Sequence, residues 1–500
     1  MTHRSAGVRP THLSADYVVV GSGAGGAIAA AELARAGARV ALIEAGAWRQ
    51  PQDLPHSILG TFGATLDQWG VSITRGRALW PIVQGRAVGG GTVVNSAIIV
   101  RTPADLFERW SSELGIDGLA DAVWAAQDEI EAELEVGPTQ PDQLGRHNAL
   151  ALAGAAAAGY PSHPTVRATP GCAGAGTCLQ GCRRGHKRSA DLVYVPQVLD
   201  AGGWVLSNAP VRRVLVQGGK AVGVAGRFID PITGRPGGTF RVDADKAVIL
   251  AASAAHTPTL LQRSGVRHPA LGEGFRAHPG TTSFGIYPDP VDMVQGASQG
   301  WASTAFRTDP GYKLETLSMP PELVAGRLMG GGKALVDRLA AYRHMACFVV
   351  GIRAESVGTV RAGWGGAPVV RYTLDRADME RARHAIWTLA RTHFAAGAEA
   401  VVPGVVGLPY SLGPDQVDRI LQASLDPRHW VAILSHLFGG AVMGADPQRA
   451  VCDPRGRVRG VRGLLVVDAA VIPSNLGVNP QHTIMALSRT FTRRLLEEGA

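Results

Sequence analysis

The sequence predicts an α/β protein of more than one domain. One domain is built on a strand–helix–strand unit of the parallel, Rossmann-like kind, and the other is of the α+β type. A chain of 500 residues is too long for a single hydrophobic core. Residues 16–46 read as strand, helix and strand around a glycine motif, and residues 345–396 read as strands followed by a helix. The composition, 46% apolar and 18% charged, is that of a folded globular chain.

The first element is the strand–helix–strand unit DYVVVGSGAGGAIAAAELARAGARVALIEAG at residues 16–46. Its glycines fit G-x-G-x-x-G. Gly21 allows a tight turn, Gly23 lets the backbone approach a pyrophosphate, and Gly26 allows helix and strand to pack closely. Glu44, at the end of the second strand, can accept hydrogen bonds from a ribose and would repel a 2′-phosphate. The unit therefore predicts a Rossmann-like domain that binds FAD or NAD rather than NADP.

The next element, residues 84–110 (QGRAVGGGTVVNSAIIVRTPADLFERW), indicates which dinucleotide binds. It resembles the glucose–methanol–choline (GMC) family of flavin oxidoreductases, whose members carry G-R-x-x-G-G-[GS]-[ST]-x-x-N after the first unit. The nearest branch contains cholesterol oxidases and long-chain alcohol oxidases. The resemblance implies that FAD lies along Gly85, Arg86, Gly90, Thr92 and Asn95. Some members attach FAD through a histidine after these glycines. No histidine occurs between residues 85 and 110, so we expect non-covalent FAD.

Two later segments extend the resemblance. Residues 208–225 are similar to the family strands that bring a backbone group to the adenine, which implies a contact at Val211. Residues 464–467 (LLVV) predict a buried strand, and the resemblance places Asp468, at its end, near the ribityl chain or pyrophosphate. His256 and His278 are interpreted as packed or solvent-edge histidines, because the family's catalytic groups come later in the chain.

The last element is a helix that begins at Asn479-Pro480-Gln481. Asparagine is a favoured N-cap and proline is favoured at the first helical position. The resemblance puts this helix end beside the flavin pyrimidine, where its dipole would stabilise a reduced, anionic ring. The alternative for Asn479 is a cap with no other role.

The predicted catalytic residues are His436 and Asn479. The resemblance implies that a neutral His436 takes the hydroxyl proton of an alcohol, that the carbon delivers a hydride to flavin N5, and that Asn479 holds the oxygen. Taken alone, His436 would more simply be a hydrogen-bonded core histidine. The branch usually has H-P-x-G-G-C here, whereas this chain reads HLFGGA from His436, and the glutamate that cholesterol oxidases use is not located. His482 either points into the site as a second titrating group or packs beside FAD.

Three of the five cysteines, Cys172, Cys178 and Cys182, lie together at a spacing of C-x₅-C-x₃-C. Some sugar dehydrogenases of the family hold a 3Fe-4S cluster on three cysteines at a similar spacing, which would pass electrons onward from the flavin. Long-chain alcohol oxidases have a similar stretch, in which the cysteines need not carry iron. Both interpretations stay open.

The resemblance also predicts the domain segments. The intervening residues that match the family less clearly are assigned to the substrate domain, with an antiparallel sheet over the flavin. The FAD-binding domain comprises residues 1–112, 165–276 and 429–500, and the substrate domain comprises 113–164 and 277–428.

Together these observations predict an FAD-dependent enzyme that oxidises a hydrophobic alcohol to an aldehyde or ketone. The electron acceptor is O₂, a quinone or an electron-transfer protein. The alternatives are a hydroxynitrile-lyase-like enzyme with structural FAD, an electron-transferring dehydrogenase with a 3Fe-4S cluster, and a non-enzymatic protein that has lost its cofactor.

The charge pattern and the N-terminus bear on partners and compartment. The net charge is +8, but the arginines are scattered and lack interleaved aromatics, so nucleic-acid binding is not expected. Few cysteines and no secretory signal predict a cytoplasmic protein. Membrane contact is expected to be peripheral at most, through the partly amphipathic segment 321–348, which is read first as an ordinary surface helix.

Overall fold

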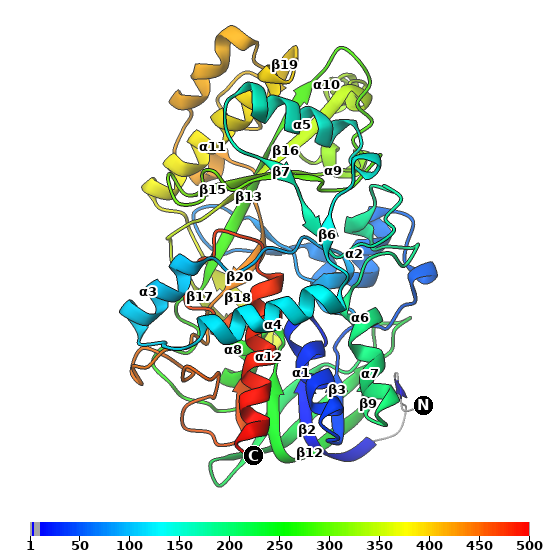
Figure 1. The fold of residues 1–500 in the computed structure, drawn as a ribbon, viewed down its shortest axis with the longest axis vertical. Coiled ribbons are helices and arrows are strands. Elements are labelled where there is room, and N and C mark those ends of the chain that lie inside the picture. The colour runs from blue at the N-terminus through cyan, green and yellow to red at the C-terminus, as the bar shows by residue number, and fades with distance from the viewer. Residues whose placement is uncertain (1–2, 5–10, 500) are drawn as a thin grey trace.

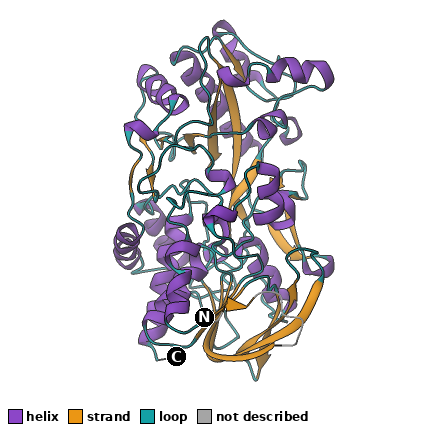
Figure 2. Cartoon of the chain, turned by 90° about the vertical axis from the view of Figure 1, so that its right-hand side faces the viewer, coloured by secondary structure: helices purple, strands orange, loops and turns teal. Residues whose placement is uncertain are grey.

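The structure is a computed structural model that describes residues 3–4 and 11–499. Two sheets follow one another along the long axis of the molecule, one in its lower half and one in its upper half (Figure 1). Helices flank both sheets, as the side view in Figure 2 shows. The predicted α/β fold with a second, antiparallel domain is confirmed.

The first sheet has the spatial order β1-β9-β3-β2-β12-β11-β10, with β21 also paired to β12. The neighbouring strands β1, β9, β3, β2 and β12 are parallel to one another, and β21 is parallel to β12. The pairs β12 with β11 and β11 with β10 are antiparallel. The strands are β1 (His3–Arg4), β2 (Thr11–Val20), β3 (Val40–Ile43), β9 (Trp204–Leu206), β10 (Val211–Gln217), β11 (Lys220–Ile229), β12 (Pro236–Leu250) and β21 (Leu464–Val466).

The second sheet has the order β4-β5-β20-β13-β16-β15-β14-β7, with β19 paired to β13. Its pairs are antiparallel apart from β5 with β20. The strands are β4 (Ser72–Ile73), β5 (Pro81–Ile82), β7 (His163–Pro164), β13 (Arg276–Ile286), β14 (Trp301–Ser303), β15 (Tyr312–Thr316), β16 (Met345–Ile352), β19 (Ala400–Val402) and β20 (Ile433–Phe438). Two further pairs stand apart: β6 (Gly137–Pro138) with β8 (Val166–Arg167), and β17 (Thr359–Ala362) with β18 (Pro368–Arg371).

Twelve α-helices are found in the described residues, and α12 packs against both α1 and α4 beside the first sheet (Figure 1). Helix α11 packs on the second sheet, against β13 and β16. The helices are α1 (Ala24–Arg35), α2 (Ile58–Thr65), α3 (Ala104–Leu114), α4 (Ala120–Glu133), α5 (Arg146–Ala157), α6 (Ala190–Val193), α7 (Val195–Asp200), α8 (Ser253–Arg263), α9 (Pro321–Ala325), α10 (Gly332–Leu339), α11 (Arg376–Ala395) and α12 (Gln481–Glu497).

Segment 321–348 does not form one amphipathic surface helix. It forms the short helices α9 and α10 and the first residues of β16. Within residues 3–4 and 11–499, the structure contains no helix both long and apolar enough to cross a membrane.

Candidate active site

A cavity of about 800 Å³ extends from the first sheet to the second and brings the predicted site residues together. Every predicted cofactor residue except Gly26 lines it, and so do both predicted catalytic residues. The lining includes Gly21, Gly23, Glu44, Gly85, Arg86, Gly90, Thr92, Asn95, Val211, Asp468, His436 and Asn479.

Gly26 lies outside the lining because its place is in the packing behind the cavity. A Cβ on Gly26 would lie 1.9 Å from the carbonyl oxygen of Gly21, so only glycine lets α1 approach β2 this closely. In the lining itself, Gly90 has a φ of +55°, and a Cβ there would lie 2.7 Å from the Cα of Gly23. The two glycine segments thus approach each other with backbone alone, as a pyrophosphate site requires.

Helix α1 leaves its first backbone N–H groups available at this point. Its N-cap, Gly23, makes no side-chain hydrogen bond. Uncapped N–H groups and the helix dipole favour an anion there.

Glu44 follows β3 and is 6% exposed. Its Oε2 accepts hydrogen bonds from the backbone N–H and the hydroxyl of Ser22, and its Oε1 accepts one from the N–H of Gly46. Burial raises the pKa of Glu44. An ionised carboxylate has about four acceptor sites, so one stays open for a ribose hydroxyl.

Thr92 and Asn95 line the cavity, but their side chains are hydrogen-bonded within the protein. The Thr92 hydroxyl donates to the carbonyl of Gly89 at 2.6 Å and accepts from the N–H of Ala190. The Asn95 amide donates to Oε1 of Gln481 at 2.5 Å, which joins the glycine segment to the start of α12. These residues therefore shape the cavity wall.

Asp468 follows β21 of the first sheet and lines the cavity. Its oxygens accept from the N–H of Ser253, the hydroxyl of Thr257 and the N–H of Ala470. Burial raises its pKa to about 6. Asp468 holds the turn between β12 and α8 against the C-terminal segment.

His436 lies on β20, directly opposite His278 on β13, and the two Nδ1 atoms are 3.1 Å apart. The N–H of Gly477 donates to Nε2 of His278 at 2.9 Å, so the proton of neutral His278 is on Nδ1. His278 then donates to Nδ1 of His436, and neutral His436 carries its own proton on Nε2. Burial, together with the cation of Lys313, lowers the pKa of His436 to about 3. His278 is thus in contact with the predicted base, which the sequence interpretation missed.

Asn479 is not the cap of α12. The N-cap is Pro480, without a side-chain hydrogen bond, and Oδ1 of Asn479 instead accepts from Nζ of Lys313 at 2.5 Å. This bond fixes the amide so that its NH₂ group, which has no partner among the described residues, is free to donate into the cavity. The interpretation of Asn479 as a cap alone is wrong, because Lys313 competes for its side chain.

Lys313 belongs to a polar group on β15 that the sequence reading missed. Its Nζ is 2.8 Å from Oε1 of Glu315, and Oε2 of Glu315 accepts from Gln299 at 3.2 Å. All three side chains line the cavity, and burial lowers the pKa of Lys313. The two-residue spacing of Lys313, Glu315 and Leu317 is the sequence feature that could have identified these site residues, because residues two apart on a strand share a sheet face. Glu315 is also an acid from the second sheet beside the site.

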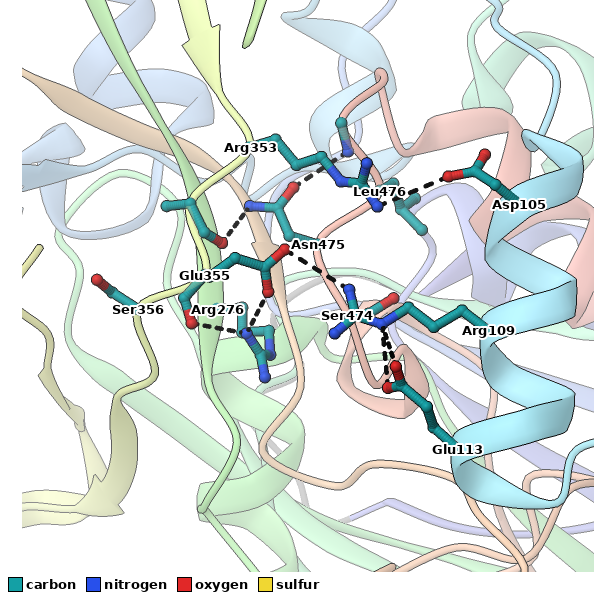
Figure 3. Close-up of polar contacts among 12 residues, drawn as sticks. Asp105, Arg109, Glu113, Arg276, Arg353, Glu355, Ser356, Ser474, Asn475 and Leu476 are labelled. Atoms are coloured by element: carbon teal, nitrogen blue, oxygen red, sulfur yellow. Dashed lines mark hydrogen bonds and ion pairs between the residues drawn. The ribbon is translucent and has the colours of Figure 1, made fainter. Parts of the chain in front are cut away.

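The loop before α12 is held by the network in Figure 3. Asn475 donates to the carbonyls of Ala277 and Ala354, and its Oδ1 accepts from the N–H of Gly477. Around it, Arg353 approaches Asp105 at 3.7 Å and Arg109 approaches Glu355 at 3.5 Å. This network fixes the backbone that positions His278 and Asn479.

Two other histidines take no part in the His278–His436 pair. His482 is fully buried, and its Nε2 is 3.3 Å from the carbonyl of Gln127 on α4. It is not among the residues that line the cavity, so its side chain does not point into the site. Nε2 of His256 is 2.9 Å from Asp67, at the edge of the cavity.

The three clustered cysteines do not converge. Cys172, Cys178 and Cys182 are all unpaired, and nowhere in the described part of the chain do three or more His, Cys, Asp or Glu side chains gather as metal ligands. Cys178 instead accepts a hydrogen bond from Arg167, and Lys187 is buried close by. The 3Fe-4S prediction is not supported by this geometry.

Comparison with known proteins agrees with this site. Sequence models of the GMC oxidoreductase family match residues 15–280 and 354–488. The chain is 36% identical to an uncharacterised GMC-type oxidoreductase of Mycobacterium tuberculosis, over 96% of this chain and 75% of the relative. It is 27% identical to a long-chain-alcohol oxidase of Arabidopsis thaliana, over 97% and 67%.

Among solved structures, pyridoxine 4-oxidase from Mesorbium loti has the same fold, with a TM-score of 0.72, 20% identity and coverage of 96% and 98%. The chain belongs to the GMC oxidoreductase family. It is therefore an FAD-dependent oxidoreductase that acts on CH–OH donors. The glycine cradle, the open end of α1 and the buried Glu44 fit FAD.

Proposed function

We propose that this enzyme oxidises a hydrophobic alcohol to an aldehyde or ketone, with His436 and Asn479 acting on the hydroxyl group. FAD, when bound, supplies the acceptor for the hydride that leaves the carbon. The single observation that carries the proposal is the convergence of His436, Asn479 and Lys313 on the cavity that the nucleotide-binding residues also line. The relatives named long-chain-alcohol oxidases support an alcohol substrate.

His436 is proposed as the acceptor of the hydroxyl proton, and Asn479 as the donor that holds the oxygen. With a pKa of about 3, His436 is neutral at any physiological pH, as a base must be. Because His278 donates to its Nδ1, His436 can take the proton only if this hydrogen bond reorganises.

Lys313 is a second candidate for the proton acceptor. Burial lowers the pKa of Lys313, which favours its neutral amine form. The Nζ atom of Lys313 contacts the side-chain oxygen of Asn479. In this alternative the Nε2–H of His436 donates to the substrate oxygen, and Lys313 takes the proton.

The test is anaerobic reduction of the holoenzyme by a series of primary alcohols. The loss of the yellow flavin colour is the measured signal. We expect His436→Ala to keep FAD bound but to reduce the rate of bleaching by at least about 100-fold. His482→Ala is the matched control, because this buried histidine lies outside the cavity lining. Full-rate bleaching in His436→Ala would remove His436 from the reaction. A yellow enzyme that no alcohol bleaches, but that cleaves a cyanohydrin, would be a lyase.

The acceptor is proposed to be O₂, a quinone or an electron-transfer protein, and reoxidation assays with each would separate them. The cytoplasm stays the predicted compartment, because all five cysteines are unpaired, as a reducing environment favours.

A further inference from the structure

The wall of the cavity that belongs to the second sheet changes from polar to apolar along β15 and the segment after it. Lys313 and Glu315 come first, followed by Leu317 and then Met319. They are spaced two residues apart and all line the cavity, as side chains on one face of an extended segment do. Leu323 and Val349 add to the apolar part.

Arg327 lines the cavity beyond these apolar residues. It follows α9 and is partly buried, and its Nη1 donates to the carbonyl of Val431 at 3.3 Å. No aspartate or glutamate in the described part of the chain forms an ion pair with it. The guanidinium carries five N–H donors, so most of them are open. Burial lowers the pKa of Arg327, and a bound anion would offset that cost.

The distance between Arg327 and the catalytic pair follows from strand register. The carbonyl of Val431 also accepts from the hydroxyl of Thr281, so Arg327 lies level with Thr281 on β13. Thr281 is three residues from His278, which pairs with His436. At about 3.3 Å per residue, the stretch of β13 from His278 to Thr281 spans roughly 10 Å. An unpaired cation at the far end of an apolar passage is suited to the second end of a substrate.

We propose that the substrate is a hydroxy acid, with its hydroxyl group at His436 and Asn479, an apolar chain along Leu317 and Met319, and its carboxylate on Arg327. This rests on the proposed alcohol oxidation and names the class of alcohol. Arginine binds carboxylates through two parallel hydrogen bonds, which gives both affinity and orientation. The carboxylate at one end selects which end of the chain reaches the histidines.

The experiment compares octanol with ω-hydroxyoctanoate as reductants of the holoenzyme under anaerobic conditions. We expect kcat/KM for the hydroxy acid to exceed that for octanol by about 10- to 100-fold, the range for hydrogen bonds to a charged group. In Arg327→Met this ratio should fall to about one, and Arg327→Lys should keep part of it. Arg376→Gln is the matched control, because this exposed arginine on α11 is paired with Glu380 and should keep the wild-type ratio.

A second measurement does not depend on turnover. Octanoate lacks the hydroxyl, and calorimetric titration of the holoenzyme should show it binding with an affinity that falls by the same factor in Arg327→Met. Equal kcat/KM for the two wild-type substrates, or an unchanged ratio in both Arg327 variants, would overturn the proposal. Octanoate binding that depends on Arg327 while no alcohol or hydroxy acid bleaches the flavin would keep the anion site and refute alcohol oxidation instead. Unbleached flavin with no octanoate binding would refute both.

Discussion

At the scale of single residues, Lys313 connects the groups expected to handle the proton. It contacts Asn479 at 2.5 Å and Glu315 at 2.8 Å, and its charge contributes to the low pKa of His436. The amide of Asn479 can face the cavity only because Lys313 occupies its oxygen. A residue found through none of the family motifs therefore controls both predicted catalytic groups.

Lys313→Met should move the acid limb of the pH profile. A base is active when unprotonated, so kcat/KM falls as the pH drops below its pKa. Removing the nearby cation raises the pKa of His436 from about 3, and the acid limb should shift to higher pH. The measurement is kcat/KM against pH for the wild type and Lys313→Met, with the FAD content checked in each.

Exposed Lys333 provides the matched control, because it pairs only with Asp337 on α10, and Lys333→Met should leave the profile unchanged. Complete loss of flavin reduction in Lys313→Met at every pH would contradict this account, because reduction would then require Lys313 itself or the Asn479 amide that it holds. An unshifted profile would show that the cation does not act on His436.

At the scale of elements, α12 is held to α1 and α4 by a buried arginine. Arg489 is fully buried, and its Nη2 is 2.7 Å from Glu133 while its Nη1 is 3.3 Å from Glu129. Glu32 on α1, 7% exposed, also pairs with Arg489 and with Arg493. The start of α12 lines the cavity, so these ion pairs position one wall of the site.

Arg489→Met should lower the free energy of unfolding by about 3 kcal/mol. The substitution nearly keeps the side-chain volume but removes the charged hydrogen bonds of Arg489 to Glu32, Glu129 and Glu133, while Glu32 keeps Arg35 and Arg493 as partners. Urea unfolding monitored by circular dichroism at saturating FAD would measure the change. Arg494→Met is the control, because Arg494 donates only to the carbonyl of Gly118 and has no carboxylate partner among the described residues. Equal stability of the two variants would contradict this account.

The elements also show what could be predicted from the sequence. The unit at 16–46, the strand near residue 464 and the helix over 376–396 follow from local periodicity, and the structure contains them. The Gly21–Gly26 motif indicated its ligand class because its spacing is set by one chemical group. In contrast, the pairing of His278 with His436 depends on register between strands about 158 residues apart, which no local pattern encodes. The same holds for Lys313 against Asn479.

At the scale of the whole molecule, the cavity lies between the two sheets, and residues of both sheets line it. Its lining includes Gly23 and Glu44 beside the first sheet and Thr282 and Val349 on the second. A dinucleotide in this cavity would contact residues of both, so its binding energy would add to the stability of the assembled chain. A ligand present at about 1,000 times its Kd stabilises the folded state by roughly 4 kcal/mol.

We therefore expect FAD to be released when the protein is denatured, and to stabilise the folded protein when it is bound. With no histidine between residues 85 and 110, we expect denatured protein to precipitate colourless and leave flavin in the supernatant. The apparent Tm of the apoprotein should rise with added FAD. Gly90→Ala should weaken this response, because the new Cβ would lie 2.7 Å from the Cα of Gly23 and Gly90 has a φ of +55°. Gly137→Ala is the control, since nothing lies within 4 Å of its Cβ position. A yellow precipitate would show covalent attachment. An equal FAD-dependent rise of Tm in Gly90→Ala and the wild type would show that the Gly23–Gly90 approach is not part of the FAD site, because the variant alters that approach and little else.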